Sequence, residues 1–189
     1  MIGVVFITFI VGGVGFFSWY HSQPSWKVQT ITDPKISFEY PSVIRPNILT
    51  DSEKNDKFLF RAKEVQDTNT PPMLVTLRHE DGLRAPAALT HQELIDMLLG
   101  NIDKAYPQRF PGYEALSTHK FEQDGHKAAE LFFTYDSPSG GKIKQRLLIA
   151  DIDGNRVIYL SAQAKESDYP QLDKKYFTKI FSSLIFEQG

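Results

Sequence analysis

The chain has 189 residues, with 21 Lys and Arg against 23 Asp and Glu, a net charge of −2 and no cysteine. Because the basic residues are dispersed along the sequence, their pattern gives no support to a nucleic-acid or polyanion partner. The lack of cysteine excludes a disulfide framework and a thiol for lipid attachment. The length favours one domain, large enough to be held together by its own core.

Residues 1–20 contain no Lys, Arg, Asp or Glu, and Thr8 and Ser18 are their only polar side chains. About twenty apolar helical residues are enough to cross the roughly 30 Å hydrocarbon core of a bilayer. A cleaved signal peptide would have a basic start and a small-x-small cleavage site, whereas the best such site, Gly13-Val14-Gly15, lies inside the apolar run. The segment is therefore predicted to be an uncleaved transmembrane signal-anchor.

Trp19, Tyr20 and Trp26 are predicted to lie at the membrane interface, where amphipathic aromatic rings are enriched. Residues 21–26 form a short linker, which spans about 20 Å when fully extended. The domain from residue 27 to residue 189 is thus expected close to the bilayer.

The orientation of this domain follows from two opposing signals. Lys27, Lys35 and Arg45 follow the apolar segment and favour a cytoplasmic domain. A short N-terminal tail before a folded domain is typical of a signal-anchor, and we expect the domain on the extracytoplasmic side, whether periplasmic, extracellular or lumenal.

Alternating apolar and polar residues predict strands along most of the domain. In the strand predicted at 57–65, Phe58, Phe60 and Ala62 are expected to share one buried face. The polar stretch 51–57 predicts an exposed turn. Asp124-Gly125 and Asp153-Gly154-Asn155 predict two hairpin turns. The predicted strands are 27–32, 36–40, 57–65, 73–79, 114–123, 126–135, 142–152 and 156–164.

Two amphipathic helices are predicted. The first begins at Thr90, where T-x-x-E forms a capping box with Glu93, and is expected to end at Pro107. The second runs from Asp168 to Leu184, with a proline in its first turn. Long antiparallel strands with two such helices specify an α+β domain.

Few residues suggest chemistry. Residues 151–155 resemble part of a calcium loop, but glycine is misplaced for one, and a hairpin turn is favoured. No motif for a nucleophile or for phosphate binding occurs. The histidines show no zinc-ligand spacing and are interpreted as surface residues: His21, His79, His91, His119 and His126. No catalytic residue, metal ligand or cofactor is predicted, and no enzymatic activity.

Two features leave alternatives open. Glu130 lies in an apolar strand, where a carboxylate can act as an acid or a ligand. Pairing with a cross-strand cation such as Arg146 is the favoured alternative. The aromatic loop Phe110-Pro111-Gly112-Tyr113 suits an interface, and it equally suits packing against the first helix.

Several segments resemble the PsbP-like family. They are Ile31–Pro34 with Ile36–Pro41, then Asp124–Leu131, and finally Arg156–Ala164 with the closing pattern Phe177-x-x-Ile180-x-x-Ser183-Leu184-x-Phe186. The chain departs from the plant members in its apolar N-terminal segment, and from cyanobacterial lipoprotein members in having no cysteine.

The resemblance covers about Trp26 to Phe186. It implies an α/β/α sandwich around a central antiparallel sheet of about six or more strands, the fold of the Ran-binding Mog proteins. It also implies a non-enzymatic role, since the family includes an extrinsic lumenal subunit that supports the oxygen-evolving centre of photosystem II.

The expected function is that of a membrane-anchored accessory or assembly subunit that docks on a membrane protein complex. The alternative is a domain that binds a small apolar, lipid-like ligand, because aromatic residues make up 13% of the chain. A cavity between sheet and helices above roughly 300 Å³, with a few convergent polar groups, would favour this alternative.

Overall fold

The computed structural model describes residues 24–83 and 89–187. The predicted signal-anchor, with Trp19 and Tyr20, lies outside these residues. No helix in the described ranges is both long and apolar enough to span a bilayer.

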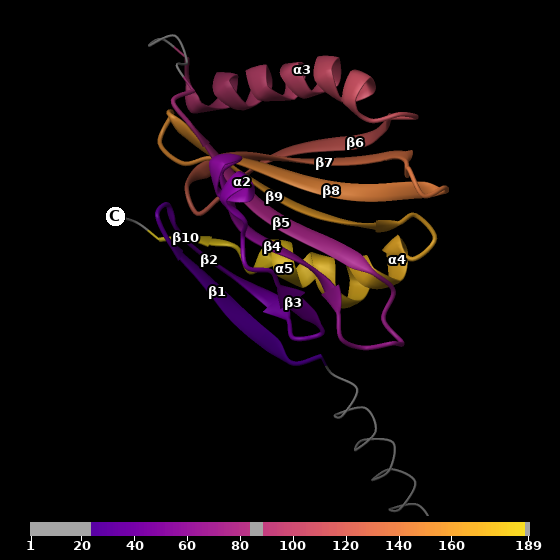
Figure 1. The fold of residues 1–189 in the computed structure, drawn as a ribbon. Helices are drawn as coiled ribbons and strands as arrows, with labels where there is room; N and C mark the ends of the chain where they lie inside the picture. Colours follow the sequence, from indigo (N-terminus) through magenta and orange to yellow (C-terminus); the bar gives the residue numbers. More distant parts are fainter. Residues whose placement is uncertain (1–23, 84–88, 188–189) are drawn as a thin grey trace, which may run out of the picture.

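The larger sheet has seven antiparallel strands in the order β3-β4-β5-β9-β8-β7-β6 (Figure 1). Both predicted hairpins are present as β6 with β7 and as β8 with β9. The strands are β3 (Ile44–Pro46), β4 (Phe58–Val65), β5 (Met73–Asp81), β6 (Glu114–Gln123), β7 (His126–Asp136), β8 (Lys142–Asp151) and β9 (Arg156–Lys165).

A smaller sheet has the strand order β1-β2-β10, with β1 (Trp26–Thr32), β2 (Lys35–Pro41) and β10 (Ile185–Phe186). The helical elements are α2 (Asp51–Asn55), α3 (His91–Arg109), α4 (Tyr169–Leu172), the π-helix η1 (Asp173–Phe177) and α5 (Thr178–Ser182).

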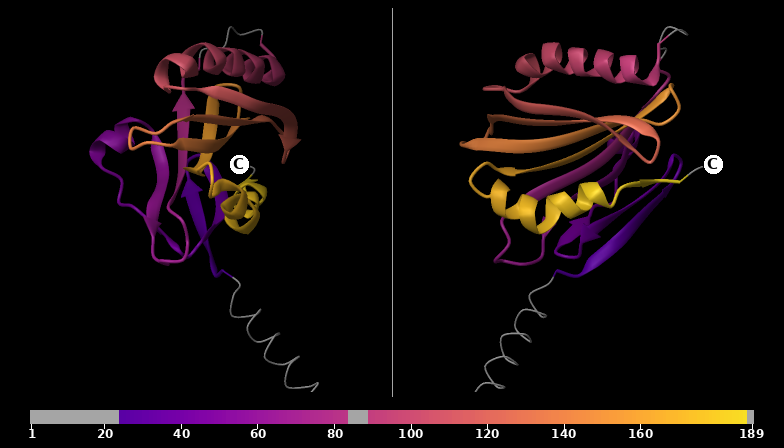
Figure 2. Two further views of the ribbon diagram at one scale, coloured as in Figure 1. Left: turned by 90° about the vertical axis from the view of Figure 1, so that its right-hand side faces the viewer. Right: turned by 180° about the vertical axis from the view of Figure 1, so that it is seen from behind.

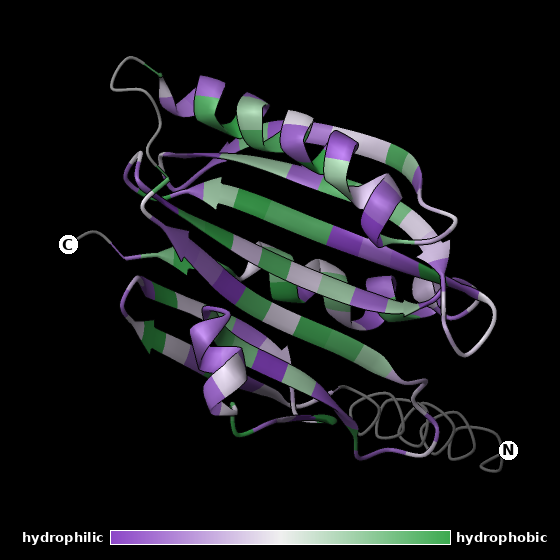
Figure 3. Ribbon diagram, turned by 45° about the horizontal axis from the view of Figure 1, so that its top comes forward, coloured by the Kyte–Doolittle hydropathy of each residue, from purple (hydrophilic) through white to green (hydrophobic). Residues whose placement is uncertain are grey.

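Helices cover both faces of the larger sheet, α3 on one and α4, η1 and α5 on the other (Figure 2). The upper core lies under α3 and includes Ile95, Phe133 and Ile149. The lower core lies between the sheet, the C-terminal helical segment and β2, and includes Leu148 and Phe177. Figure 3 shows the long apolar runs that the central strands need when both of their faces are covered. The prediction of an α+β domain with a mainly antiparallel sheet is confirmed.

The predicted exposed turn at 51–57 is wrong, because Asp51–Asn55 form helix α2, although none of its residues is buried. Its start has a capping box in which the Glu53 N–H donates to Thr50 Oγ1 at 3.2 Å and the Thr50 N–H donates to Glu53 Oε2 at 2.9 Å. The capping box and the ion pair between Glu53 and Arg61 therefore stabilise this helix, which contributes no residue to the core.

The capping box at Thr90 is confirmed, with the Thr90 N–H donating to Glu93 Oε2 at 2.7 Å. The prediction that Pro107 ends the helix is wrong, since α3 continues to Arg109. Proline removes only one hydrogen bond in this final turn, and the Phe110 N–H closes the turn by donating to the Tyr106 carbonyl at 2.8 Å.

The predicted continuous helix from Asp168 to Leu184 is interrupted by η1. The wider π-helical turn changes the angle between successive side chains. Tyr176 and Phe177 in η1 and Phe181 in α5 are all buried in the lower core.

Candidate binding sites

Trp26 is the one predicted membrane-interface residue within the described ranges. It begins β1, where its ring centroid lies 6.4 Å from that of Tyr176 and the Lys179 ammonium lies 4.3 Å from its ring centroid. The indole thus packs against the C-terminal helical segment. Its contact with a membrane stays a prediction.

Glu130 forms an ion pair with Arg146, whose Nε–H donates to Glu130 Oε1 at 3.1 Å. The two side chains are only 13% and 14% exposed. Arg146 also lies 3.7 Å from the Asp173 carboxylate and 4.2 Å from the ring centroid of Phe181. The ion-pair interpretation of Glu130 is confirmed.

The aromatic loop that follows α3 packs inward. The ring centroids of Phe110 and Tyr113 lie 5.0 and 5.9 Å from that of Tyr106. Tyr113 is also 5.4 Å from Phe133 in the upper core. Of the two alternatives for this loop, packing against the helix is therefore confirmed.

Residues 151–155 form the turn between β8 and β9, as the hairpin interpretation predicts. The Asp151 carboxylate is fully buried, accepts a bond from the Gly154 N–H at 2.7 Å, and lies 2.5 Å from His91 Nδ1 on α3. His126 Nδ1 on β7 lies 3.1 Å from the Asp151 carbonyl oxygen. Sequence spacing does not indicate that His91 and His126 both lie beside Asp151, because the two histidines come from distant elements.

The other histidines have separate surroundings. His79 Nδ1 is 3.2 Å from the Asp81 carboxylate, and exposed His119 stacks on Phe121 with ring centroids 5.8 Å apart. His21 lies outside the described residues.

The β6–α5 groove is a hollow of about 500 Å³ on the lower face of the larger sheet. Its apolar lining includes Phe121, Phe181, Leu184 and Ile185, and its polar lining includes His119, Gln123, Glu130 and Arg146. Ile185 is 52% exposed. The groove therefore offers open apolar surface beside a paired charge.

Strand β6 forms one wall of this groove and one edge of the sheet. Among the described residues it pairs with β7 alone, and most of its residues are exposed, including Leu116 at 44%. An edge strand presents backbone N–H and C=O groups to which another extended segment can bond.

A second hollow, of about 220 Å³, lies on the upper face of the sheet beside the C-terminal end of α3. We call it the arginine hollow, because its lining includes Arg61, Arg78 and Arg109. The neutral polar groups around them are Thr76, Gln145, Tyr159, Ser161 and Gln163.

Strand register gathers these side chains from β4, β5, β8 and β9. Thr76 lies opposite Arg61 in one pairing and opposite Ser161 in another, and Gln145 lies opposite Gln163. Directly opposed residues project from the same face of a sheet. The Thr76 and Ser161 hydroxyl oxygens are accordingly 2.7 Å apart.

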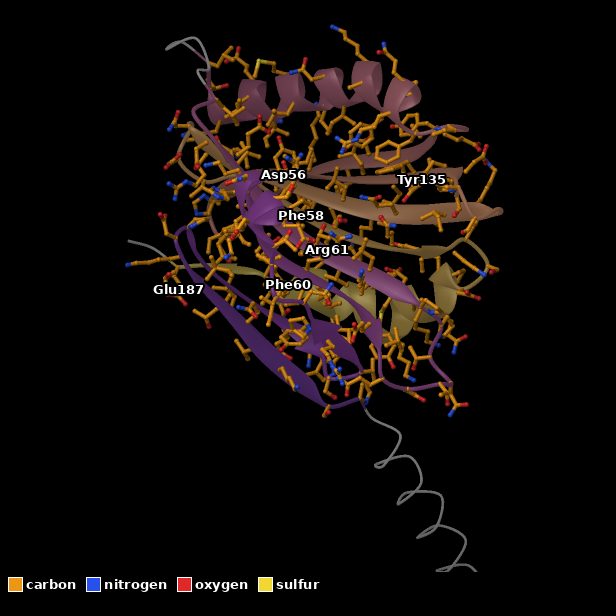
Figure 4. All side chains as sticks on the ribbon, in the orientation of Figure 1. Asp56, Phe58, Phe60, Arg61, Tyr135 and Glu187 are labelled. Carbon is orange, nitrogen blue, oxygen red and sulfur yellow. The ribbon has the colours of Figure 1, made fainter. Side chains whose placement is uncertain are left out.

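The predicted shared face of Phe58, Phe60 and Ala62 is wrong. The register of β4 against β5 shifts between Phe58 and Phe60, and a bulge moves the following residues to the other face. Phe60 and Ala62 enter the lower core, whereas Phe58 lines the arginine hollow with Arg61. Figure 4 labels Phe58 and Arg61 along β4.

Two tyrosines, Tyr106 and Tyr159, line the hollow beside its arginines. Burial raises the pKa of Tyr106, and the guanidinium groups of Arg78 and Arg109 oppose this rise. Burial and the nearby Glu80 raise the pKa of Tyr159 far above its usual value, and the Tyr159 hydroxyl donates to Glu80 at 3.0 Å. Tyr106, Arg78 and Arg109 all line the hollow.

The sequence matches no protein-family model and no curated protein. Among solved structures, it is similar to the cyanobacterial PsbP (CyanoP) of Synechocystis, with a TM-score of 0.59 and 10% identity over 87% of this chain and 94% of the other. LpqN of Mycobacterium tuberculosis, described as involved in cell envelope biogenesis, is similar with a TM-score of 0.54 and 15% identity over 87% of this chain and 92% of the other. The Ran-binding protein Mog1p of Saccharomyces cerevisiae is similar with a TM-score of 0.55 and 8% identity over 87% of this chain and 96% of the other. The chain therefore has the fold that PsbP and Mog1p share.

Proposed function

We propose that this chain is a non-enzymatic docking domain, anchored by residues 1–20 on the extracytoplasmic side of a membrane. It binds an extended segment of a membrane protein complex along β6. The observation that carries the proposal is the open edge of β6 beside the β6–α5 groove. Cyanobacterial PsbP and LpqN, the latter described as involved in cell envelope biogenesis, share the fold and support an accessory role outside the cytoplasm.

Strand addition accounts for both parts of this surface. Main-chain hydrogen bonds to the β6 edge provide affinity, and a pocket beside the strand selects alternate side chains. The apolar residues Phe121, Phe181 and Ile185 line that pocket. The partner segment is therefore extended, with apolar side chains at every second position.

The anchor and the partner are tested separately. If residues 1–20 are a retained anchor, the full chain stays with membranes through a carbonate wash, whereas a chain that begins at Pro24 is released. Release of the full chain would contradict the anchor without affecting the docking surface.

Docking is tested by placing a photo-crosslinking residue at Thr118 on β6, in native membranes. The matched control is Val28 on β1, an exposed apolar residue, 67% exposed, on the edge of the other sheet. We expect one stoichiometric membrane partner to be crosslinked from Thr118 and not from Val28. Equal crosslinking from both positions, or recovery of a free monomer only, would contradict the proposal.

A small apolar ligand is the second candidate function. The groove volume of about 500 Å³ lies within the range of roughly 300–1,000 Å³ of small-molecule sites, and the Glu130 and Arg146 pair supplies polar groups at its wall. Saturable binding of a fluorescent fatty acid, lost in Ile185→Glu, would favour this function. Crosslinking of a protein partner without such binding would exclude it.

A further inference from the structure

Two of the three arginines that line the hollow form no ion pair among the described residues. Within the described part of the chain, neither Arg78 nor Arg109 has a carboxylate within 4.0 Å, whereas Arg61 is paired with Glu53. The Arg61 Nε–H is buried and has no hydrogen-bond partner there. Buried donors without partners are rare in folded proteins.

The Arg78 guanidinium is also held in place. It lies 4.0 Å from the ring centroid of Tyr159, and that ring is fixed by the bond from its hydroxyl to Glu80. Arg109 is exposed, and its guanidinium lies 5.7 Å from the ring centroid of Phe110. Arg78 therefore loses less side-chain freedom on binding a ligand than a free side chain would.

We propose that the arginine hollow binds a single phosphate group, carried either by a small solute or by a lipid headgroup. Guanidinium groups bind phosphate oxygens in a bidentate manner. The hydroxyls of Thr76 and Ser161 and the amide of Gln145, a residue only 9% exposed, supply neutral polar groups in the same hollow.

Charge and size favour a phosphate group over a carboxylate and over a large apolar ligand. Arg78 and Arg109 together balance the charge of about −1.5 to −2 of a phosphate monoester, whereas a single carboxylate leaves excess positive charge. The volume of about 220 Å³ is below the roughly 300 Å³ of sites for drug-sized ligands. The hollow is thus suited to a phosphate group and not to a large apolar molecule.

This site goes beyond the docking proposal, because it lies on the α3 face of the sheet and the β6–α5 groove lies on the opposite face. Either proposal can fail alone. A phosphate site without a crosslinked partner at β6 would overturn docking only, and a partner without phosphate binding would overturn this site only.

The test is a calorimetric titration of the full chain in an uncharged detergent at low ionic strength, where exposed charges are least screened. The probes are inorganic phosphate and, for comparison, acetate. Two further probes, dihexanoyl phosphatidic acid and dihexanoyl phosphatidylcholine, test a lipid source for the phosphate. We expect phosphate to bind about tenfold more tightly than acetate, because two guanidinium groups engage it.

The variants Arg78→Gln and Arg109→Gln are each expected to weaken phosphate binding by about tenfold. Arg45→Gln is the matched control, because Arg45 lies outside the hollow and its side chain is 63% exposed, and it should bind as the wild type does. If Arg78→Gln does not fold, Arg78→Lys takes its place. Lysine retains the positive charge but lacks the planar guanidinium that binds in a bidentate manner, so this variant is expected to bind phosphate more weakly than the wild type.

The comparison with dihexanoyl phosphatidic acid identifies whether the phosphate group belongs to a lipid or to a solute. Tighter binding of dihexanoyl phosphatidic acid than of inorganic phosphate would indicate a headgroup, and equal or weaker binding would indicate a solute. No saturable phosphate or phosphatidic acid binding, no preference over acetate, or equal weakening by Arg45→Gln would overturn the proposal.

Discussion

Replacing Arg146 with Met should destabilise the domain strongly, because it removes the cation that balances Glu130. Both side chains are about six-sevenths buried, and Arg146 also lies 3.7 Å from the Asp173 carboxylate. Breaking a buried pair by removing one partner costs about 3–5 kcal/mol. Loss of the contact with the Phe181 ring contributes to the same cost.

The double variant Glu130→Gln with Arg146→Met separates charge from packing. It removes the uncompensated carboxylate of Glu130, so we expect it to be about 2 kcal/mol more stable than Arg146→Met alone. Arg45→Met is the control. Its pair with Glu64 has side chains 63% and 55% exposed, and such surface pairs contribute less than about 1 kcal/mol.

Urea unfolding of a chain that begins at Pro24 measures these differences. Trp26 is the only tryptophan of that chain, and it packs against the C-terminal helical segment, so its fluorescence reports unfolding. A total stability of about 5–15 kcal/mol leaves the single variant measurable. A cost below about 1 kcal/mol for Arg146→Met, or no recovery in the double variant, would refute the structural role of Glu130.

Four further substitutions test local features. Thr90→Ala should cost about 1 kcal/mol in thermal unfolding through loss of the cap. The Thr90 backbone N–H lowers the pKa of Glu93 below its ordinary 4.5. The wild type should therefore be more stable than Glu93→Gln above pH 4.5, and this advantage should disappear as the pH falls through the lowered pKa of Glu93. Burial raises the pKa of Asp173 above its ordinary 3.8, so the ionised form of this side chain lowers the stability of the fold. Asp173→Asn should therefore raise the melting temperature at pH 7. This gain should disappear as the pH falls to 3.8. Gly112→Ala should cost about 1–2 kcal/mol, because its backbone angle φ is 64° and a new Cβ would clash with the Asp136 carboxylate. An unchanged urea midpoint would contradict this.

The hairpins and α3 could be predicted because their signals are local. Asp124-Gly125 supplies two positive backbone angles, 51° and 83°, within the dipeptide itself. The capping box at Thr90 likewise requires only four consecutive residues. These two features could therefore be predicted from neighbouring residues alone.

One miss is local, because the capping box of Thr50 and Glu53 that begins α2 lies within four consecutive residues. Other misses depend on distant partners. The bulge near Phe58 exists only through the register of β4 against β5, and no pattern inside one strand indicates it. Tyr159, Ser161 and Gln163 alternate along the strand predicted at 156–164, and this spacing places them on one face, but the arginines beside them come from other elements. The Glu130 and Arg146 pair was predictable, since their strands follow each other in the chain and pair directly.

The position of β6 at the end of the strand order has a consequence for local opening. Strands β8 and β9 bury side chains in both cores, so their amides exchange with solvent only when the whole domain unfolds. Strand β6 contributes no residue to the fully buried set and is bonded on one side, so its amides exchange during small, frequent openings. The strand that we propose for docking can therefore adjust its backbone to a partner while both cores stay closed.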